Sequence, residues 1–317
     1  MATADIKQRI AFESDRRARL SVPAAAGGGL FLLSGIILNA ALKELPKVGI
    51  VQGLEPALRG QATPAIGPQA AEVKYIDHHS LDLIAGNVLM AIAVLALTLV
   101  LLFIGDCTRF RRPQTWPAGR PLVLAGGIGY ALLNIVHEVG LAIETHKFAT
   151  GNDFSGKAAE RALLTSGSLG IALALLGLLA ALALTVGMIA VMVGSLRAGL
   201  LPRWLSTLGM LAGLMFLPLF GSGLVQTLIP TLWLVAMGFL LWERLPSGDP
   251  PAWAAGEARP WPTQSEQRVK RAEEKDGSAS GRAGGQKSER NGSEPAADLA
   301  PPPTPLAGGS RRKRRKR

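Results

Sequence analysis

Six long stretches of apolar residues, separated by polar or proline-containing connections, constrain the fold of this chain more than any other feature. They cover residues 24–42, 81–104, 121–143, 162–196, 204–220 and 224–242. A helix needs about 20 apolar residues to cross the roughly 30 Å hydrocarbon layer of a bilayer. Backbone groups in hydrocarbon must also be hydrogen-bonded within the structure, which favours helices. The sequence therefore predicts an all-α transmembrane bundle of six spans.

The segments around these stretches divide the chain into three parts. Residues 1–23 are predicted to form a basic N-terminal segment, residues 24–242 the six-span domain, and residues 243–317 a disordered cytoplasmic tail. The tail is rich in Pro, Gly and Ser and has no hydrophobic period, so it cannot bury enough apolar surface to offset its ordering entropy. The connection at residues 43–80 contains four prolines. It is predicted to be irregular and to lie as a cap over the outer surface.

The fourth and sixth stretches carry signals about helix packing. The fourth, at 35 residues, is longer than one perpendicular span requires, so we expect tilt or a helical extension. Small residues recur in it at helical spacing, which favours close packing against another helix. These residues are Gly170, Ala174, Gly177 and Ala181. Pro230 is predicted to kink the sixth span.

Lys and Arg indicate which side of the membrane holds the chain ends. Six spans place both termini on one side, and basic residues cluster before the first span and after the second and fourth. The positive-inside rule assigns that side to the cytoplasm, although the outer connections also carry Lys and Arg. We therefore predict a multi-pass protein of the cell membrane with both termini cytoplasmic. Trp116, Trp204 and Trp242 are predicted to lie at the cytoplasmic boundary.

The pair Arg16-Arg17 before the first apolar stretch has an alternative interpretation as a twin-arginine export signal. The apolar run that follows is long for a signal core, and further spans come after it. We therefore interpret the arginines as the anchor of a retained first span.

The formal charge of +11 arises largely at the C-terminus. The last seven residues are all basic, and without them the charge is 34 − 7 − 23 = +4. Such a run can hold anionic lipid head groups at roughly 1 kcal/mol per basic residue. Nucleic acid is the alternative partner, because phosphate neutralisation needs only clustered cations. The run consists of Arg311, Arg312, Lys313, Arg314, Arg315, Lys316 and Arg317.

The third apolar stretch carries more polar residues than any other. Tyr130, Asn134, His137 and Glu144 fall on one helical face, and Glu138 lies beside it. A charged group in hydrocarbon costs about 2.5–3.5 kcal/mol on insertion scales, so such residues usually face protein or water. We expect Asn87, Tyr130 and Asn134 to form hydrogen bonds between helices.

All four histidines fall on the predicted outer side of the membrane. His78 and His79 precede the second span and His146 follows the third. His137 lies roughly 24 Å into the ~30 Å layer, counting ~1.5 Å per residue from residue 121. If spans two and three are adjacent, the histidines form an outer-leaflet cluster with nearby carboxylates. The predicted cluster consists of His78, His79, Asp82, His137, Glu138, Glu144 and His146.

This cluster has several interpretations. Imidazole and carboxylate side chains suit a divalent metal such as zinc, copper or iron. They also suit a proton relay of the kind found in transporters. Haem between His137 and His78 or His79 fits less well, because neither ligand lies deep in the bundle. In the structural interpretation the side chains only form hydrogen bonds, Asp82 favours a helix N-terminus, and Glu144, near a helix C-terminus, needs a cationic partner.

Two local motifs are rejected. Residues 151–158 match a phosphate-binding loop, except that Ala158 replaces the hydroxyl residue that binds magnesium. We predict a glycine-rich turn there, with Ser155 capping the next helix. The pair His137-Glu138 begins like the helix of a zinc protease, but Leu141 occupies the position of the second histidine.

The segment Gly199-Leu200-Leu201-Pro202-Arg203-Trp204-Leu205, followed by residues 208–213, resembles a group of bacterial multi-pass membrane proteins known only as a domain of unknown function. The run Arg16-Arg17-Ala18-Arg19 before the first span is similar to a second feature of that group. The resemblance implies a six-helix bundle and supplies no catalytic residues. Pro202 also suits a helix start and Trp204 a head-group boundary.

Two functions of different classes follow from these features. The first is a small transporter or ligand-handling protein with its polar site at the outer leaflet. The second is a non-catalytic membrane component whose polybasic tail binds anionic lipid, nucleic acid or a partner. A membrane enzyme is a third alternative, less favoured because no catalytic motif survives.

Overall fold

The computed structural model describes residues 3–46, 59, 69–163, 168–218, 224–244, 250–259 and 261. Every regular element in these ranges is a helix, as the sequence predicts. The chain divides into two compact units, Met1–Trp261 and Pro262–Arg317. The second unit, which includes the polybasic run, lies outside the described residues.

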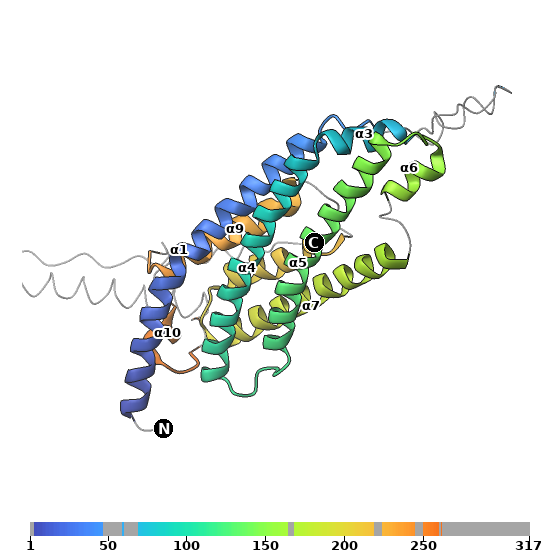
Figure 1. Ribbon diagram of the computed structural model, residues 1–317. Helices are drawn as coiled ribbons and strands as arrows, with labels where there is room; N and C mark the ends of the chain where they lie inside the picture. Colours follow the sequence, from blue (N-terminus) through green and yellow to red (C-terminus); the bar gives the residue numbers. More distant parts are fainter. Residues whose placement is uncertain are drawn as a thin grey trace, which may run out of the picture. The chain divides into compact units, whose positions relative to one another are not determined.

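The described residues of the first unit form four long helices and five shorter ones (Figure 1). The long helices are α1 (Thr3–Leu42), α4 (Ser80–Arg111), α5 (Gly119–Thr150) and α7 (Ser168–Ala198). The shorter helices are α3 (Ala70–His78), α6 (Gly156–Leu163), α8 (Arg203–Leu214), α9 (Leu224–Leu241) and α10 (Pro251–Ala255).

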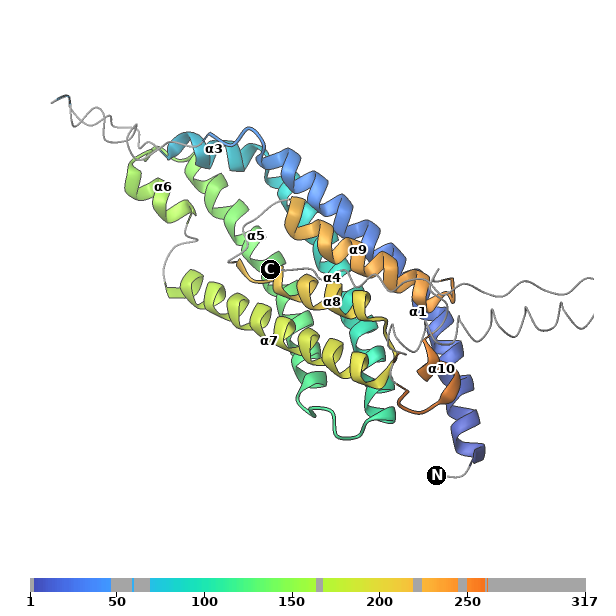
Figure 2. The ribbon, with the colours of Figure 1, turned by 180° about the vertical axis from the view of Figure 1, so that it is seen from behind.

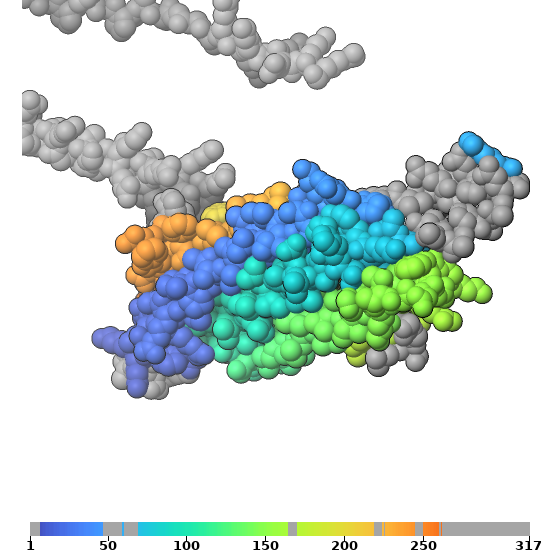
Figure 3. All heavy atoms as spheres, turned by 45° about the horizontal axis from the view of Figure 1, so that its top comes forward, coloured from blue at the N-terminus to red at the C-terminus, as the bar shows by residue number. Residues whose placement is uncertain are grey.

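The main helices form two layers. Helices α1, α4 and α5 lie side by side, as Figure 3 shows, and α9, α8 and α7 form the second layer behind them (Figure 2). The layers meet where α1 contacts α9 and where α5 contacts α7. The buried core between them is apolar and is centred on Leu97, Leu184, Met188, Leu205 and Trp233.

Four helices in the described residues are long and apolar enough to cross a membrane. They are Lys7–Leu42, Ser80–Arg111, Gly119–Thr150 and Gly170–Ala198. The prediction of six spans is therefore confirmed only in part. The fourth predicted stretch, 162–196, includes the end of α6 at Leu163 and most of α7 from Ser168, and residues 164–167 lie outside the described residues.

Helix α8 is shorter than the fifth predicted span, residues 204–220. It has 12 residues, or roughly 18 Å of helix, whereas the hydrocarbon layer is roughly 30 Å thick. Pro218 explains where it ends, because a proline ring clashes with the carbonyl four residues earlier, which belongs to Leu214. The Thr185 hydroxyl donates a hydrogen bond to the Gly213 carbonyl at 2.8 Å. Since Thr185 lies near the middle of α7, α8 ends midway along the bundle.

Helix α9 runs antiparallel to α1. A side chain at Gly35 would overlap Thr227, and one at Gly28 would overlap Val235. Gly35 stands seven residues before the end of α1 at Leu42, so α9 begins within the length of α1. The short helix α8 thus ends, and the short helix α9 begins, partway along the length of the bundle.

One end of the bundle, here called the basic end, is fixed by buried charges. Arg111 Nη2 donates to Glu13 Oε2 at 2.7 Å, and Arg111 Nε donates to the Ala252 carbonyl at 3.1 Å. Arg17 donates to the Leu240 carbonyl. The guanidinium groups of Arg17 and Arg111 lie 4.8 and 5.3 Å from the ring centroid of Trp253. These contacts join α1, α4, α9 and α10.

Two predicted segment boundaries, at residues 23 and 243, differ from those in the structure at the basic end. The segment at residues 1–23 is not separate from the first span, because α1 is one helix from Thr3 that includes Pro23. The predicted tail at residues 243–317 begins too early. Helix α10 lies within it, and Trp253 is only 6% exposed and donates from Nε1 to the Leu200 carbonyl at 3.0 Å. Aromatic rings and cations paired in this way can bury surface that composition alone assigns to solvent.

The opposite end, here called the histidine end, is closed by short helices. Residues 43–80 were predicted to be irregular, but they contain α3. Ala70 and Val73 of α3 pack with Phe148 of α5 and with Ala159 and Ala162 of α6. The described part of the connection therefore covers the end of α5, in line with the predicted cap.

One close contact between two long helices involves backbone rather than side chains. A Cβ at Gly126 of α5 would overlap the backbone of Leu184 in α7. We expect Gly126→Ala to lower the free energy of unfolding in detergent micelles by about 1–3 kcal/mol, because backbone cannot rotate away. Gly29→Ala is the matched control, since nothing lies within 4 Å of that position. The control should be neutral or stabilising by up to ~1 kcal/mol. Equal effects of the two variants would contradict this packing.

The buried ion pair at the basic end gives a second prediction. The side chains of Arg111 and Glu13 are 0% and 6% exposed, so Arg111→Ala leaves a carboxylate buried without its partner. We expect a loss of about 3–5 kcal/mol in unfolding free energy. Arg19→Ala is the control, because its pair with Asp15 is exposed and worth about 0–1 kcal/mol.

The double variant Glu13→Leu/Arg111→Met separates the charge effect from lost packing. Removing both partners leaves no uncompensated charge, so much of the stability lost in Arg111→Ala should return. A double variant as unstable as Arg111→Ala would show that the ion pair is not the cause.

Candidate functional site

The predicted histidine cluster is divided in the structure. At the histidine end, the His78 ring lies edge-on to the His79 ring, with centroids 5.1 Å apart. The His79 ring stacks on Tyr75, and its Nδ1 lies 3.0 Å from the Tyr75 carbonyl oxygen. A carbonyl can only accept, so this bond assigns the proton to Nδ1 and leaves Nε2 of a neutral His79 as the acceptor.

His146 and Glu144 have partners of their own. His146 Nδ1 lies 3.2 Å from Asp77 Oδ1, a contact that joins α5 to α3. Lys147 Nζ donates to Glu144 Oε1 at 2.8 Å, which confirms the expected cationic partner. Asp82 lies in the first turn of α4, where the helix dipole favours a carboxylate, as predicted.

No metal site forms from these side chains in the described residues. Nowhere in that part of the chain do three or more His, Cys, Asp or Glu side chains lie close enough to hold one ion. His137, which the sequence grouped with His78 and His79, lines a cavity between helices instead. The histidine-end groups are therefore placed singly or in pairs, and the pair His146–Asp77 joins α5 to α3.

The turn before α6 adopts the predicted capped form. The Ala158 backbone N–H donates to Ser155 Oγ at 3.3 Å, directly before α6. The Ser155 N–H donates to Asp153 Oδ1 at 3.0 Å, and this bond lowers the pKa of the Asp153 carboxyl group. The segment is a helix cap, which agrees with rejecting a phosphate loop here.

The intramembrane cavity that contains His137 is the candidate site. It has a volume of about 330 Å³. Its wall combines residues of α5 and α7 with residues around the gap between α8 and α9. The wall consists of Tyr130, Leu133, Asn134, His137, Leu173, Ala174, Gly177, Leu178, Ala181, Phe216, Pro218 and Gln226.

Small residues of α7 create part of this space. Ala174, Gly177 and Ala181 were predicted to pack closely against another helix, but they line the cavity. Nothing lies within 4 Å of a Cβ placed at Gly177. The close packing of α7 occurs further along the helix, where a Cβ at Gly187 would overlap Val123. The stripe of small residues therefore leaves room between α5 and α7 instead of closing it.

Residues at the end of α8 and the start of α9 form another wall of the cavity. Two backbone carbonyls in this region accept hydrogen bonds from side chains of neighbouring helices. Gln226 Nε2 donates to the Met215 carbonyl at 2.9 Å, and Thr185 donates to the Gly213 carbonyl. These two carbonyls lie where α8 ends, so no further α-helical turn supplies N–H donors to them. The Gly213 carbonyl also accepts from the Phe216 N–H at 3.3 Å. In an apolar layer such groups need donors from neighbouring helices. The Gln226 bond thus joins α9 to the residue that follows α8.

The polar face of α5 enters the cavity in a different way from that predicted. Asn134 Nδ2 donates to the Tyr130 carbonyl at 3.0 Å, and Asn87 Nδ2 donates to the Leu83 carbonyl at 3.0 Å. Each bond lies within a single helix, so these amide N–H groups are bonded locally, and the interhelical role of Asn87 and Asn134 stays a prediction. Tyr130 does reach another segment, because its ring meets Phe216 edge-on at 5.4 Å.

The lining defines what the cavity can accommodate. It is mostly aliphatic and aromatic, and its polar groups are one phenol, one imidazole and two amides. None of the described lining residues is Asp, Glu, Lys or Arg. Ligand pockets commonly combine an apolar wall with a few polar groups that fix orientation. The cavity therefore suits a neutral molecule with an apolar body and one or two hydrogen-bonding groups.

No family model, no curated protein and no solved structure matches this chain. The resemblance around residues 199–213 thus rests on its motif alone. In the structure this motif is a packed turn: Leu200 and Leu205 accept hydrogen bonds from Trp253 and Trp233. Pro202 stands directly before α8, as predicted for a helix start. The motif therefore serves the packing of the basic end.

Sequence reasoning missed three residues of the cavity wall, namely Phe216, Pro218 and Gln226, as neighbours of His137. The signal for them was Pro218, which cannot lie inside an unbroken helix without a defect. A defect inside an apolar stretch is tolerated where it lines a cavity.

The separation of the histidines gives a prediction about metal. We expect His137→Ala and His146→Ala to bind zinc as the parent does, because the described residues offer imidazoles only singly or in pairs. Elemental analysis after chelation and zinc titration in mild detergent measures this. If the parent binds stoichiometric zinc and each substitution removes it, His137 and His146 share a metal site and this prediction is wrong.

Proposed function

We propose that this chain is a membrane protein that binds a small neutral molecule in the intramembrane cavity and carries it through the bilayer. The observation that supports this most is that α8 ends and α9 begins inside the bundle. The carbonyls of Gly213 and Met215 are hydrogen-bonded there, and the cavity lies beside them and beside polar residues of α5. Substrate sites of transporters commonly lie near the bilayer midplane beside discontinuous helices.

The volume and chemistry of the cavity define the ligand class. An apolar cavity of about 150 Å³ accepts benzene, so about 330 Å³ accommodates a larger molecule. A buried charge would have no counter-ion among the described lining residues, which disfavours ions. Tyr130 and His137 of α5 and Gln226 of α9 supply hydrogen-bond donors and acceptors at the wall of the space. A substituted aromatic alcohol or a short amphiphile fits these properties.

The proposed location is the cell membrane, with the basic end in the cytoplasm. Several arginines lie in the terminal helical turns at this end or directly after α4, namely Arg109, Arg112, Arg120, Arg197 and Arg203. Trp116, Trp204 and Trp242 are 51%, 50% and 56% exposed, as expected for tryptophans at a head-group boundary. The arginines favour insertion with this end in the cytoplasm, and the tryptophans favour a head-group boundary at this level.

A filling substitution tests the proposal. Ala174→Phe places a ring in the cavity, whereas Leu175→Phe adds a ring on the exposed side of α7. The probe is 1-naphthol, a neutral aromatic with one hydroxyl, added to the full chain in nanodiscs, with signal from empty nanodiscs subtracted. We expect Ala174→Phe to weaken binding at least tenfold and Leu175→Phe to leave it within twofold.

Polar substitutions and flux extend the test. His137→Leu should weaken binding of 1-naphthol more than binding of naphthalene, because only the first forms a hydrogen bond. Proteoliposomes loaded with 1-naphthol should release it faster than protein-free liposomes loaded in the same way, and Ala174→Phe should abolish the difference. Equal binding by parent, Ala174→Phe and Leu175→Phe would refute a role for the cavity.

A further inference from the structure

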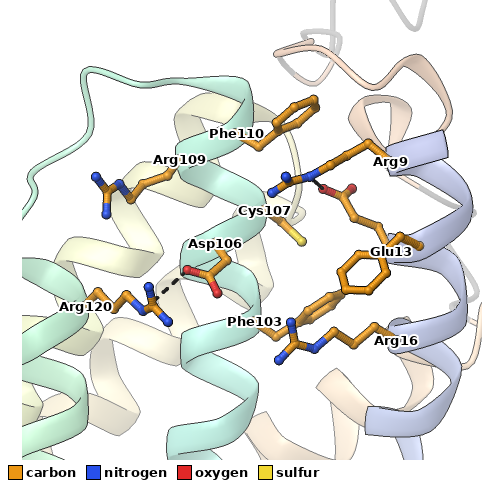
Figure 4. Close-up of a pocket in the computed structure, with 10 residues that line it drawn as sticks. Arg9, Glu13, Arg16, Phe103, Asp106, Cys107, Arg109, Phe110 and Arg120 are labelled. Atoms are coloured by element: carbon orange, nitrogen blue, oxygen red, sulfur yellow. Dashed lines mark ion pairs between the residues drawn. The ribbon is translucent and has the colours of Figure 1, made fainter. Parts of the chain in front are cut away.

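A second cavity lies at the basic end, between α1, α4 and the start of α5, and it is rich in arginine. We call it the arginine cavity. Its volume is about 380 Å³. Figure 4 shows Arg9 and Arg16 extending from α1 and Arg120 from α5 toward the same space, with Arg109 at its far side. The lining consists of Arg9, Phe12, Glu13, Arg16, Phe103, Asp106, Cys107, Arg109, Phe110 and Arg120.

The charges around this cavity leave a positive excess. Four arginines line it and Arg111 lies behind Glu13, against the two carboxylates Glu13 and Asp106, which gives 5 − 2 = +3. Both carboxylates already have cationic partners. Glu13 Oε2 lies 2.7 Å from Arg111 Nη2, and Asp106 Oδ1 lies 3.6 Å from Arg120 Nε. The remaining positive charge is therefore on Arg9, Arg16 and Arg109.

Aromatic rings hold two of these arginines in place. The Arg9 guanidinium lies 4.5 Å from the Phe110 ring centroid, and that of Arg16 lies 5.9 Å from the Phe12 ring centroid. A guanidinium that rests on a ring face keeps the N–H groups at its edge directed outward. Arg9 is 4.0 Å from Glu13 Oε1, which is long for an ion pair. Ring contact thus orients these cations without neutralising them.

The level of the cavity along the bundle indicates where its ligand comes from. Asp106 and Arg109 occupy the last turns of α4, and Arg120 the first turn of α5. The exposed tryptophan Trp116 lies between these two helices, and interfacial tryptophans sit at the level of lipid head groups. Arginine side chains there meet phosphate oxygens, which guanidinium groups bind through paired hydrogen bonds.

We propose that the arginine cavity binds a phosphate-bearing anion, with Arg9 and Arg16 as its main contacts and Arg109 at the rim. The proposal is independent of the ligand in the intramembrane cavity. Two sources supply the same chemistry, namely the head group of an anionic phospholipid and a soluble phosphate.

The test compares two double variants of the full chain. Arg9→Gln/Arg16→Gln removes the cations of the cavity, and Lys7→Gln/Arg19→Gln removes equal charge from the same helix outside the lining. Neither pair includes a buried residue, so both proteins should fold. In one arm, native mass spectrometry measures phosphatidylglycerol retained after extraction from membranes that also contain phosphatidylcholine. In the other, inorganic phosphate is added to protein in phosphatidylcholine nanodiscs and the thermal midpoint is recorded.

We expect the parent and Lys7→Gln/Arg19→Gln to retain phosphatidylglycerol, and Arg9→Gln/Arg16→Gln to retain at least fivefold less. That result assigns the site to a lipid head group. A rise in thermal midpoint with inorganic phosphate, lost only in Arg9→Gln/Arg16→Gln, assigns it to a soluble phosphate. If both double variants behave alike in both arms, the arginine cavity is not an anion site and the proposal fails.

Discussion

A helix that ends inside an apolar bundle must find hydrogen-bond donors for its last carbonyl groups, and the centre of this structure depends on that constraint. Pro218 prevents α8 from continuing past Leu214. Thr185 and Gln226 then donate to the carbonyls of Gly213 and Met215. Because the donors belong to α7 and α9, the depth at which α8 ends also fixes how these helices lie against it. The space that α8 leaves becomes part of the intramembrane cavity.

The two ends of the bundle are held by different forces. At the basic end, Glu13 and Arg111 are buried together, and a buried charge must keep its partner. Trp253 brings α10 into this network, so a segment with the composition of a tail is part of the bundle. At the histidine end, a small apolar cluster and the exposed pair His146–Asp77 join the short helices. Exposed pairs contribute little, so that end depends mainly on apolar contact.

Local patterns predicted the parts of the structure that depend on few neighbours. Long apolar runs gave the helices, Ser155 gave the cap of α6, and Pro202 gave the start of α8. Tyr130, Asn134 and His137, which share the polar face of α5, also share the wall of the cavity. The predicted histidine cluster required positions along two different helices, and no local pattern supplies those. His137 and His146 consequently have different surroundings although they belong to one helix.

The sequence by itself determined that this chain is helical and apolar enough for a membrane, because backbone groups in hydrocarbon leave few other structures. Pro218 limits α8 from within the sequence, since proline acts on its own helix, although the predicted fifth span, 204–220, ran past it. Only the tertiary structure decided which small residues close a contact and which leave a space. Gly126 lies against the backbone of Leu184, whereas Gly177 faces nothing within 4 Å. The two glycines are alike in sequence terms, and the register between α5 and α7 makes one a packing contact and the other the wall of a cavity.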